Sequence, residues 1–174
     1  MLGKEEQKEL IEIARNSILN PSFRTKKFHK KSGVFVTLHV NGRLRGCIGF
    51  VEPDMELGEA VVKAARLAAF EDFRFPQLQK DEKFKIEISV LTEPKIIRVK
   101  NPDEYLNHIK IPGDGLIIRS RFGSGLLLPQ VFVEYKCNVK QALNMVCQKA
   151  GLEDDSWRDL DNKIYVFNAE IFKE

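Results

Sequence analysis

The sequence predicts an α+β protein in which helices pack on a mixed, largely antiparallel sheet. Two apolar runs flank Asn41-Gly42, the dipeptide most typical of a tight hairpin turn. Residues 84–91 alternate between apolar and polar side chains, which is typical of a strand with one face toward water. Segments with helical apolar stripes separate these strands. We therefore expect one domain over residues 1–174, built of two subdomains, or lobes.

The first half of the chain is expected to begin with a helix over residues 4–19, which Asn20-Pro21 ends. A basic loop follows over residues 22–31, and the hairpin strands span 34–40 and 43–50. A second helix is expected to start at Pro53-Asp54. Because this helix separates the hairpin from the strand at 84–91, a crossover connection is expected.

The second half of the chain is predicted from its turn and cap residues. We expect a short helix that begins at Asn101-Pro102-Asp103, and then a hairpin of strands 115–120 and 125–131 that turns through Arg121 to Ser124. A longer helix is expected to begin at the cap Asn138 and to end at Gly151. A strand over residues 163–172 is expected to close the chain.

The composition is that of an ordinary soluble globular protein, with 43% hydrophobic and 30% charged residues. A net charge of +3 is too small to indicate nucleic-acid binding by itself. Cys47, Cys137 and Cys147 form no CxxC pair, and the three histidines share no metal-ligand spacing, so no disulfide framework, metal or cofactor is indicated. The chain shows no signal core or membrane-length apolar run, and a reducing cytoplasm is the expected location.

The first hairpin carries the candidate nucleophile. A two-residue turn pairs Val40 with Arg43 and places Arg43, Arg45 and Cys47 in a row on one face. A guanidinium beside a thiol favours the thiolate, so Arg45 could activate Cys47. In the structural alternative, Cys47 is a small buried apolar residue and Arg45 pairs with a carboxylate. His39 would lie on the opposite face, so no Cys–His dyad is expected.

Glycines and charged residues near Cys47 complete the candidate site. Gly46 and Gly49 allow a ligand or another backbone to approach closely, and Gly49 also suits a bulge. Asp72 and Arg74 follow the second helix, where they could bind a ligand or form a structural ion pair. Asp72 is in addition a candidate partner of Arg45.

Further candidates lie outside this group. Gln130 and Glu134 follow Pro129, which suggests a strand end, and Glu134 is a possible general acid or base, although both also suit an exposed surface. The basic loop at 22–31 surrounds Phe28 and could bind phosphates, or it is simply solvated. The glycine-rich run at 121–125 lacks the Lys and Ser/Thr of a phosphate loop and is expected to be a hairpin turn.

Several stretches in fixed order identify a family resemblance. They are GVFVTL (33–38), LRGCIG (44–49), EDFRFP (71–76), EISVLTEP (87–94), LLLPQVFVE (126–134) and CQKAGL (147–152). Together they resemble the AMMECR domain of the archaeal or bacterial type, with LRGCIG as its signature, over nearly the whole chain. One departure is Cys137, which stands where relatives often have Trp. The resemblance implies two α/β lobes with a cleft near the signature, no assigned reaction, and association with Memo-like and radical S-adenosylmethionine proteins.

Three functions follow as alternatives, and whether the protein is an enzyme stays open among them. The first is a cleft that binds a small anionic ligand, such as a nucleotide or phosphorylated metabolite. The residues expected to line it are Arg45, Gly46, Cys47, Asp72 and Arg74. The second is a non-catalytic accessory protein whose signature face docks a Memo-like or radical S-adenosylmethionine partner. The third, nucleic-acid binding through the basic loop, has the least support.

Overall fold

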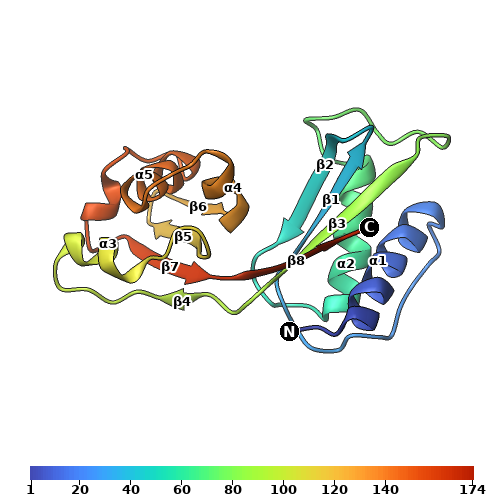
Figure 1. Cartoon of the computed structure of the whole chain (residues 1–174), viewed down its shortest axis with the longest axis horizontal. Coiled ribbons are helices and arrows are strands. Elements are labelled where there is room, and N and C mark those ends of the chain that lie inside the picture. Colours follow the sequence, from blue (N-terminus) through green and yellow to red (C-terminus); the bar gives the residue numbers. More distant parts are fainter. The chain divides into compact units, whose positions relative to one another are not determined.

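The computed structural model describes residues 1–174, and the chain forms two compact units (Figure 1). The first unit is Met1–Thr92 with Glu170–Glu174, and the second is Glu93–Ala169. Each unit has its own sheet and its own hydrophobic core, so each is described by itself. The predicted α+β class with antiparallel pairing is confirmed. None of the helices combines the length and apolar character that a membrane span requires.

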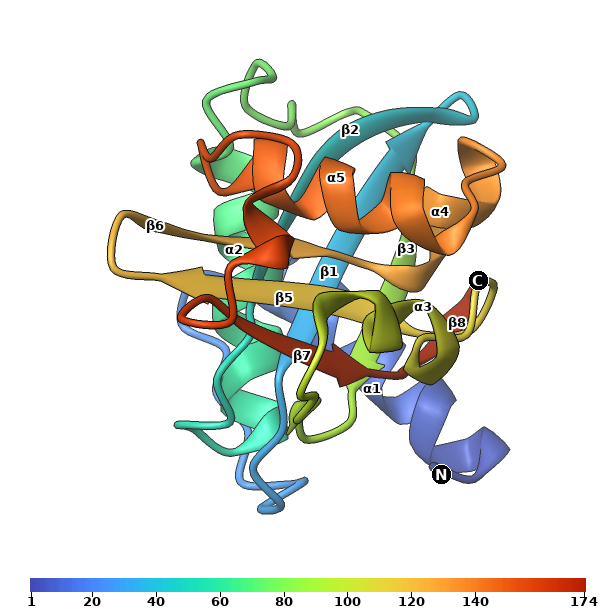
Figure 2. The ribbon, with the colours of Figure 1, turned by 90° about the vertical axis from the view of Figure 1, so that its left-hand side faces the viewer.

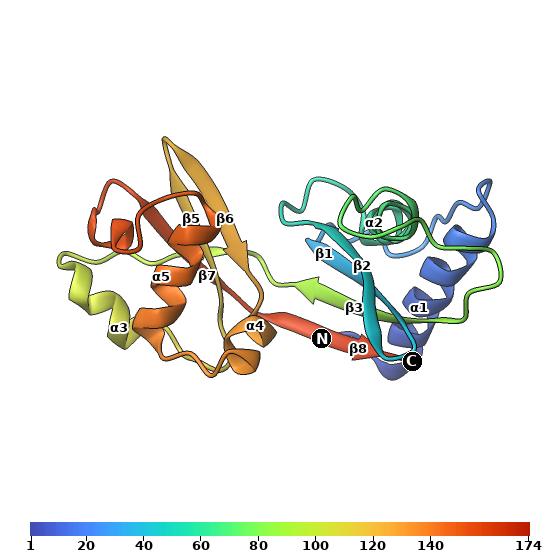
Figure 3. The same cartoon turned by 90° about the horizontal axis from the view of Figure 1, so that it is seen from above.

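The first unit packs two helices on one face of a four-stranded sheet (Figures 1 and 3). Its elements are α1 (Lys4–Leu19), β1 (Val34–Val40), β2 (Arg43–Phe50), α2 (Leu57–Phe70), β3 (Phe84–Leu91) and β8 (Ala169–Lys173). The strand order is β2-β1-β3-β8. Leu10 of α1, Val61 of α2 and Val36 of β1 are fully buried in the core between helices and sheet.

The expected crossover connection is present. Both β2 and β3 pair antiparallel with β1, so they run parallel to each other with β1 between them. The chain passes from β2 to β3 through α2, which covers this part of the sheet. The alternation predicted for β3 is also found, except that Ser89, on the face expected to be wet, is only 1% exposed.

Helix α2 begins later than the sequence predicted. We expected its start at Pro53-Asp54, but its first residue is Leu57. The backbone N–H groups of Leu57 and Gly58 donate to the carbonyl oxygens of Lys30 and Phe28, at 3.0 and 3.3 Å. The basic loop therefore supplies acceptors to two first-turn N–H groups that have no partner within the helix.

The first hairpin is confirmed, but its predicted register is wrong beyond the turn. Leu38 pairs with Gly46 rather than with Arg45, which makes Arg45 the extra residue of a β-bulge. The bulge places Cys47 opposite Thr37, on the other face of the sheet from the one we predicted.

The second unit is also a sheet with helices packed on it, and Figure 2 shows α4 and α5 beside the hairpin β5–β6. Its elements are β4 (Lys95–Ile96), η1 (Pro102–Glu104), α3 (Tyr105–His108), β5 (Gly115–Ser120), β6 (Gly123–Leu127), α4 (Pro129–Glu134), α5 (Val139–Lys149), η2 (Ser156–Arg158) and β7 (Lys163–Phe167). The strand order is β4-β7-β5-β6. Trp157, Phe132 and Cys147 are fully buried in its core.

The caps predicted for this unit are confirmed. Asn138 and Gln141 form a capping box at the start of α5. Gly151 follows that helix with a φ of +72°, a conformation that glycine adopts without steric cost. Asn101 accepts a hydrogen bond from the backbone N–H of Asp103 at the start of η1.

Two boundaries in the second half differ from the prediction. The second hairpin turns at Arg121-Phe122, and the residues after β6 form α4, because Pro129 occupies a first helical position where no N–H is needed. The closing strand predicted at 163–172 is two strands, β7 and β8, which belong to different sheets. Asn168 separates them, and its amide donates to the carbonyl of Gly113 at 3.0 Å.

We predict that the basic loop contributes to stability through its backbone rather than its charges. Replacing Lys26, Lys27, Lys30 and Lys31 with Gln should change the free energy of unfolding by no more than about 0.5 kcal/mol, because these side chains are exposed. Gly58→Ala should instead cost more than about 1 kcal/mol, because its Cβ would lie 2.2 Å from the Lys27 carbonyl oxygen. Thermal unfolding measures both; cooperative loss of structure in the lysine variant would contradict this view.

Candidate functional site

Strand β2 lies at an edge of its sheet, where backbone groups lack a neighbouring strand. At Cys47 side chains take the place of that strand. The Cys47 N–H donates to Asp72 Oδ2 at 2.9 Å, and the Cys47 carbonyl accepts from Arg74 Nη2 at 2.9 Å. Asp72 and Arg74 thereby satisfy both outward-facing backbone groups of this residue.

Asp72 and Arg74 also bind each other. Arg74 Nε donates to Asp72 Oδ1 at 2.9 Å, and Arg74 Nη2 donates to Asp72 Oδ2 at 2.7 Å. This two-pronged hydrogen bond lowers the pKa of Asp72 to about 2, assisted by the N–H groups of Cys47 and Arg74 and opposed by burial. The Asp72 side chain is 2% exposed, so its carboxylate is a buried charge whose oxygens accept hydrogen bonds within the fold.

Arg45 holds the same loop from a second point. Its Nε and Nη2 donate to the two carboxylate oxygens of Glu82 at 3.2 and 2.9 Å. Its Nη2 also donates to the Gln77 carbonyl at 2.9 Å, and its Nη1 donates to the Pro76 carbonyl. The structural interpretation of Arg45 is therefore correct. The expected pairing with Asp72 is wrong, because Glu82 is the partner.

We call Arg45, Asp72, Arg74 and Glu82 the β2 clamp, since they fasten the loop between α2 and β3 to the edge of β2. Glu82 is fixed from its other side, where Oε2 accepts from the Gln79 N–H at 2.6 Å. This hydrogen bond, followed by that from Arg45, lowers the pKa of Glu82.

The two candidate glycines are in contact with backbone. A Cβ on Gly46 would lie 2.0 Å from the carbonyl oxygen of Ala68 in α2. A Cβ on Gly49 would lie 2.3 Å from the Val34 carbonyl oxygen and 2.5 Å from the Phe35 ring. Each glycine therefore allows another part of the unit to approach closely, as we expected for a contact with backbone.

Cys47 is half-buried, and Thr37 Oγ1 donates a hydrogen bond to its sulfur at 3.2 Å. Burial raises the pKa of the thiol; the Thr37 hydrogen bond and the Arg74 charge oppose that effect without reversing it. The row expected to let Arg45 activate Cys47 is wrong, because the bulge takes Arg45 out of it and Arg45 donates to Glu82 instead. His39 is on the face of Cys47, not opposite it as predicted, because it follows Thr37 by two residues in β1.

Gln130 and Glu134 lie on α4 of the second unit, where Gln130 is half-buried and Glu134 exposed. That they share a site with Cys47 stays a prediction. The sequence did not point to three further residues of this region, namely Glu82, Thr37 and Phe73. Glu82 sits in a run of charged residues without periodicity, and the Thr37 contact depends on the bulge. No group of three or more His, Cys, Asp or Glu side chains in the structure could hold a metal ion.

We predict that Asp72→Asn lowers the free energy of unfolding by about 2 kcal/mol at neutral pH, because the carboxyl pKa falls from 3.8 to about 2 on folding. A depressed pKa stabilises the fold above the unfolded value of 3.8, and this stabilisation is lost as the pH falls toward about 2. Urea unfolding of wild type and variant should therefore converge near the lower pH. Asp81→Asn, an exposed change in the same loop, is the control. A difference that does not vary with pH would contradict the assignment.

We also predict that Cys47 reacts slowly with iodoacetamide in the native protein, because its thiol is half-buried and its pKa is raised. Arg45→Gln should accelerate this reaction by loosening the covering loop, while Arg43→Gln, at an exposed position of the same strand, should leave it unchanged. Mass spectrometry of the labelled protein measures the rates. Slower labelling of Arg45→Gln would restore the view that Arg45 activates the thiol.

Comparison with known proteins agrees with this fold. Protein MJ0810 from Methanocaldococcus jannaschii is 50% identical over 151 residues, which cover 84% of this chain and 75% of that protein. Protein MK0488 from Methanopyrus kandleri is 45% identical over 187 positions, covering 99% and 90%. The crystal structure of the uncharacterized protein PH0010 from Pyrococcus horikoshii matches with a TM-score of 0.90 and 39% identity, over 99% of this chain and 93% of that one. The AMMECR1 family matches residues 7–172, and the chain belongs to this family, as the resemblance predicted.

Proposed function

We propose that this protein is a non-catalytic accessory protein that docks a partner protein through the loop fastened by the β2 clamp. The observation that carries the proposal is Phe73. Its side chain is 95% exposed, although it sits between Asp72 and Arg74, the two most tightly bound residues of the loop.

The backbone around Phe73 is fixed on both sides. The Arg74 N–H donates to Asp72 Oδ1 at 3.2 Å, and the Phe75 N–H donates to the Asp72 carbonyl at 3.0 Å. An aromatic side chain held in water by such a turn forgoes a burial free energy of about 2 kcal/mol. A partner with an apolar pocket would gain this free energy on binding. The loop would lose little conformational entropy, since its backbone is already fixed.

Aromatic residues in rigid surroundings are the usual energetic centres of protein interfaces. Phe70, at the last position of α2, adds a further apolar side chain that is 36% exposed. The family resemblance makes a Memo-like protein the partner to test first, and a radical S-adenosylmethionine protein the second.

The alternative of a small anionic ligand at the same motif has less support. Recognition of an anion would use the two guanidinium groups, but Arg45 is committed to Glu82 and two carbonyls, and Arg74 to Asp72 and Cys47. An anion that bound the N–H groups already in use would have to displace these partners and leave the buried carboxylate of Asp72 unpaired. The raised pKa of Cys47 likewise disfavours nucleophilic catalysis there.

The test is binding of the full chain to the Memo-like and radical S-adenosylmethionine proteins of the same genome, measured by biolayer interferometry. Phe73→Ala should weaken the complex by about 30-fold, the effect of losing one central aromatic contact. Its melting temperature should stay unchanged, because the side chain makes almost no contact within the protein.

Phe122→Ala is the matched control, because Phe122 is also a strongly exposed aromatic, at 76%, and lies in the other unit. It should leave the affinity unchanged. Equal binding by wild type and Phe73→Ala would reject docking through this loop. Binding of neither protein by the wild type would reject the accessory function with these partners.

A further inference from the structure

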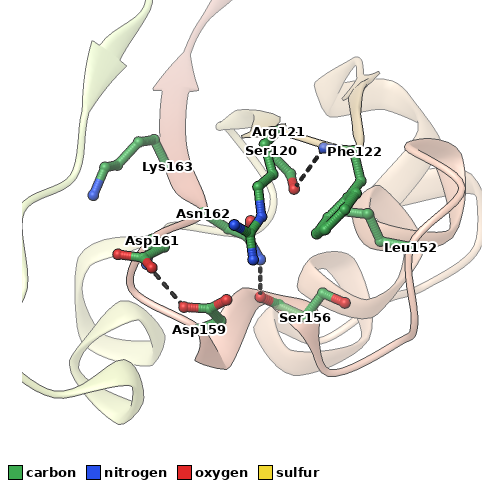
Figure 4. Close-up of a pocket in the computed structure, with 9 residues that line it drawn as sticks. All are labelled: Ser120, Arg121, Phe122, Leu152, Ser156, Asp159, Asp161, Asn162 and Lys163. Carbon is green, nitrogen blue, oxygen red and sulfur yellow. Dashed lines mark hydrogen bonds between the residues drawn. The ribbon is translucent and has the colours of Figure 1, made fainter.

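The second unit contains a pocket of about 430 Å³ that the proposed docking function does not use. It lies between the tip of the hairpin β5–β6, the segment after α5, and the turn that leads into β7 (Figure 4). Its volume falls in the range of small-molecule sites. All the side chains that line it belong to this one unit.

Hydrogen bonds fix the walls of the pocket. Ser120 Oγ accepts from the Phe122 N–H at 3.2 Å and holds the hairpin tip. Asp159 Oδ1 accepts from the Asp161 N–H at 2.9 Å and shapes the turn before β7. Asn162, which is only 8% exposed, donates from Nδ2 to the Ser156 carbonyl at 2.7 Å and joins that turn to η2. The pocket is therefore formed before any ligand arrives, which reduces the entropic cost of binding.

The charged side chains of the pocket are of both signs, and they do not pair with one another. Arg121 and Lys163 are cationic, while Asp159 and Asp161 are anionic, so their formal charges cancel. None of the four forms an ion pair with another side chain. Lys163 Nζ donates to the Leu160 carbonyl at 2.7 Å, whereas the guanidinium of Arg121 stacks over the Phe122 ring at 4.7 Å.

Figure 4 shows how these groups divide the pocket. The Arg121 side chain extends across it toward Ser156 and Asn162, with Asp159 and Asp161 on one side and Phe122 and Leu152 on the other. A guanidinium presents a planar fork of donors that matches a carboxylate, and the two aspartates offer acceptors to an ammonium group. Phe122 and Leu152 provide an apolar wall.

We propose that this pocket binds a zwitterion, namely a free α-amino acid with an apolar side chain. Its carboxylate meets Arg121, its ammonium group meets Asp159 and Asp161, and its side chain lies against Phe122 and Leu152. Because the four formal charges cancel, the pocket offers no net attraction to a phosphate or to a simple cation. A molecule that carries both charges a bond or two apart satisfies both kinds of group at once.

The experiment titrates the full chain with each of the twenty L-amino acids, using ligand-observed saturation-transfer NMR. L-leucine is the reference ligand. Isoamylamine lacks its carboxylate, and 4-methylpentanoate lacks its ammonium group. L-leucine, or another apolar member of the set, should bind saturably and at least about tenfold more tightly than either analogue, since each analogue loses one charge-assisted contact.

Arg121→Gln and Asp161→Asn should each weaken that binding about tenfold or more, and both positions are exposed, so the fold should persist. Arg98→Gln, another exposed arginine of the same unit, should leave it unchanged. The proposal is overturned if no amino acid gives a saturable signal up to about 10 mM. It is also overturned if the single-charge analogues bind as well as the zwitterion, or if the pocket variants bind as well as wild type. Because Phe73 and the β2 clamp take no part, this outcome is independent of partner docking.

Discussion

The buried carboxylate of Asp72 is the constraint on which the first unit's loop geometry depends. A carboxylate on a side chain that is 2% exposed must have its oxygens satisfied inside the protein, or it costs several kcal/mol. Asp72 meets this need with the N–H of Cys47 and the guanidinium of Arg74. Since Arg74 in turn donates to the Cys47 carbonyl, one charge fixes the end of α2, the loop after it and the edge of β2 together.

The β-bulge at Arg45 makes this arrangement possible. Without the extra residue, Gly46 would not lie opposite Leu38, where the backbone of α2 approaches to within contact of its Cα. The bulge also leaves Arg45 outside the regular pairing, free to reach Glu82 and the carbonyls of the loop. In the LRGCIG stretch, packing and edge protection thereby involve Arg45, Gly46 and Gly49.

Local signals predicted most of the elements, and non-local contacts account for the errors. Asn41-Gly42 and Asn138 act within a few residues of themselves, so the hairpin and the start of α5 could be predicted from the sequence. The late start of α2 depends on carbonyls of the basic loop, which lies more than twenty residues earlier in the chain. Arg45 and Asp72 could be named as candidates because they are charged residues close to the hairpin. Their partners could not be predicted, because a one-residue bulge determines which groups each of them reaches.

The two units use their charged residues in opposite ways. At the edge of β2, the side chains of Arg45, Asp72 and Arg74 bind one another's neighbours and the backbone, and Phe73 is exposed beside them. In the pocket of the second unit, Arg121, Asp159 and Asp161 are held by a fixed backbone yet have no ion-pair partner. Charged groups without an ion-pair partner keep their hydrogen-bonding atoms available to a ligand. Groups of this kind are where a ligand can contribute binding free energy without first breaking the structure, whereas a ligand at the β2 clamp would have to compete with the contacts that hold the loop in place.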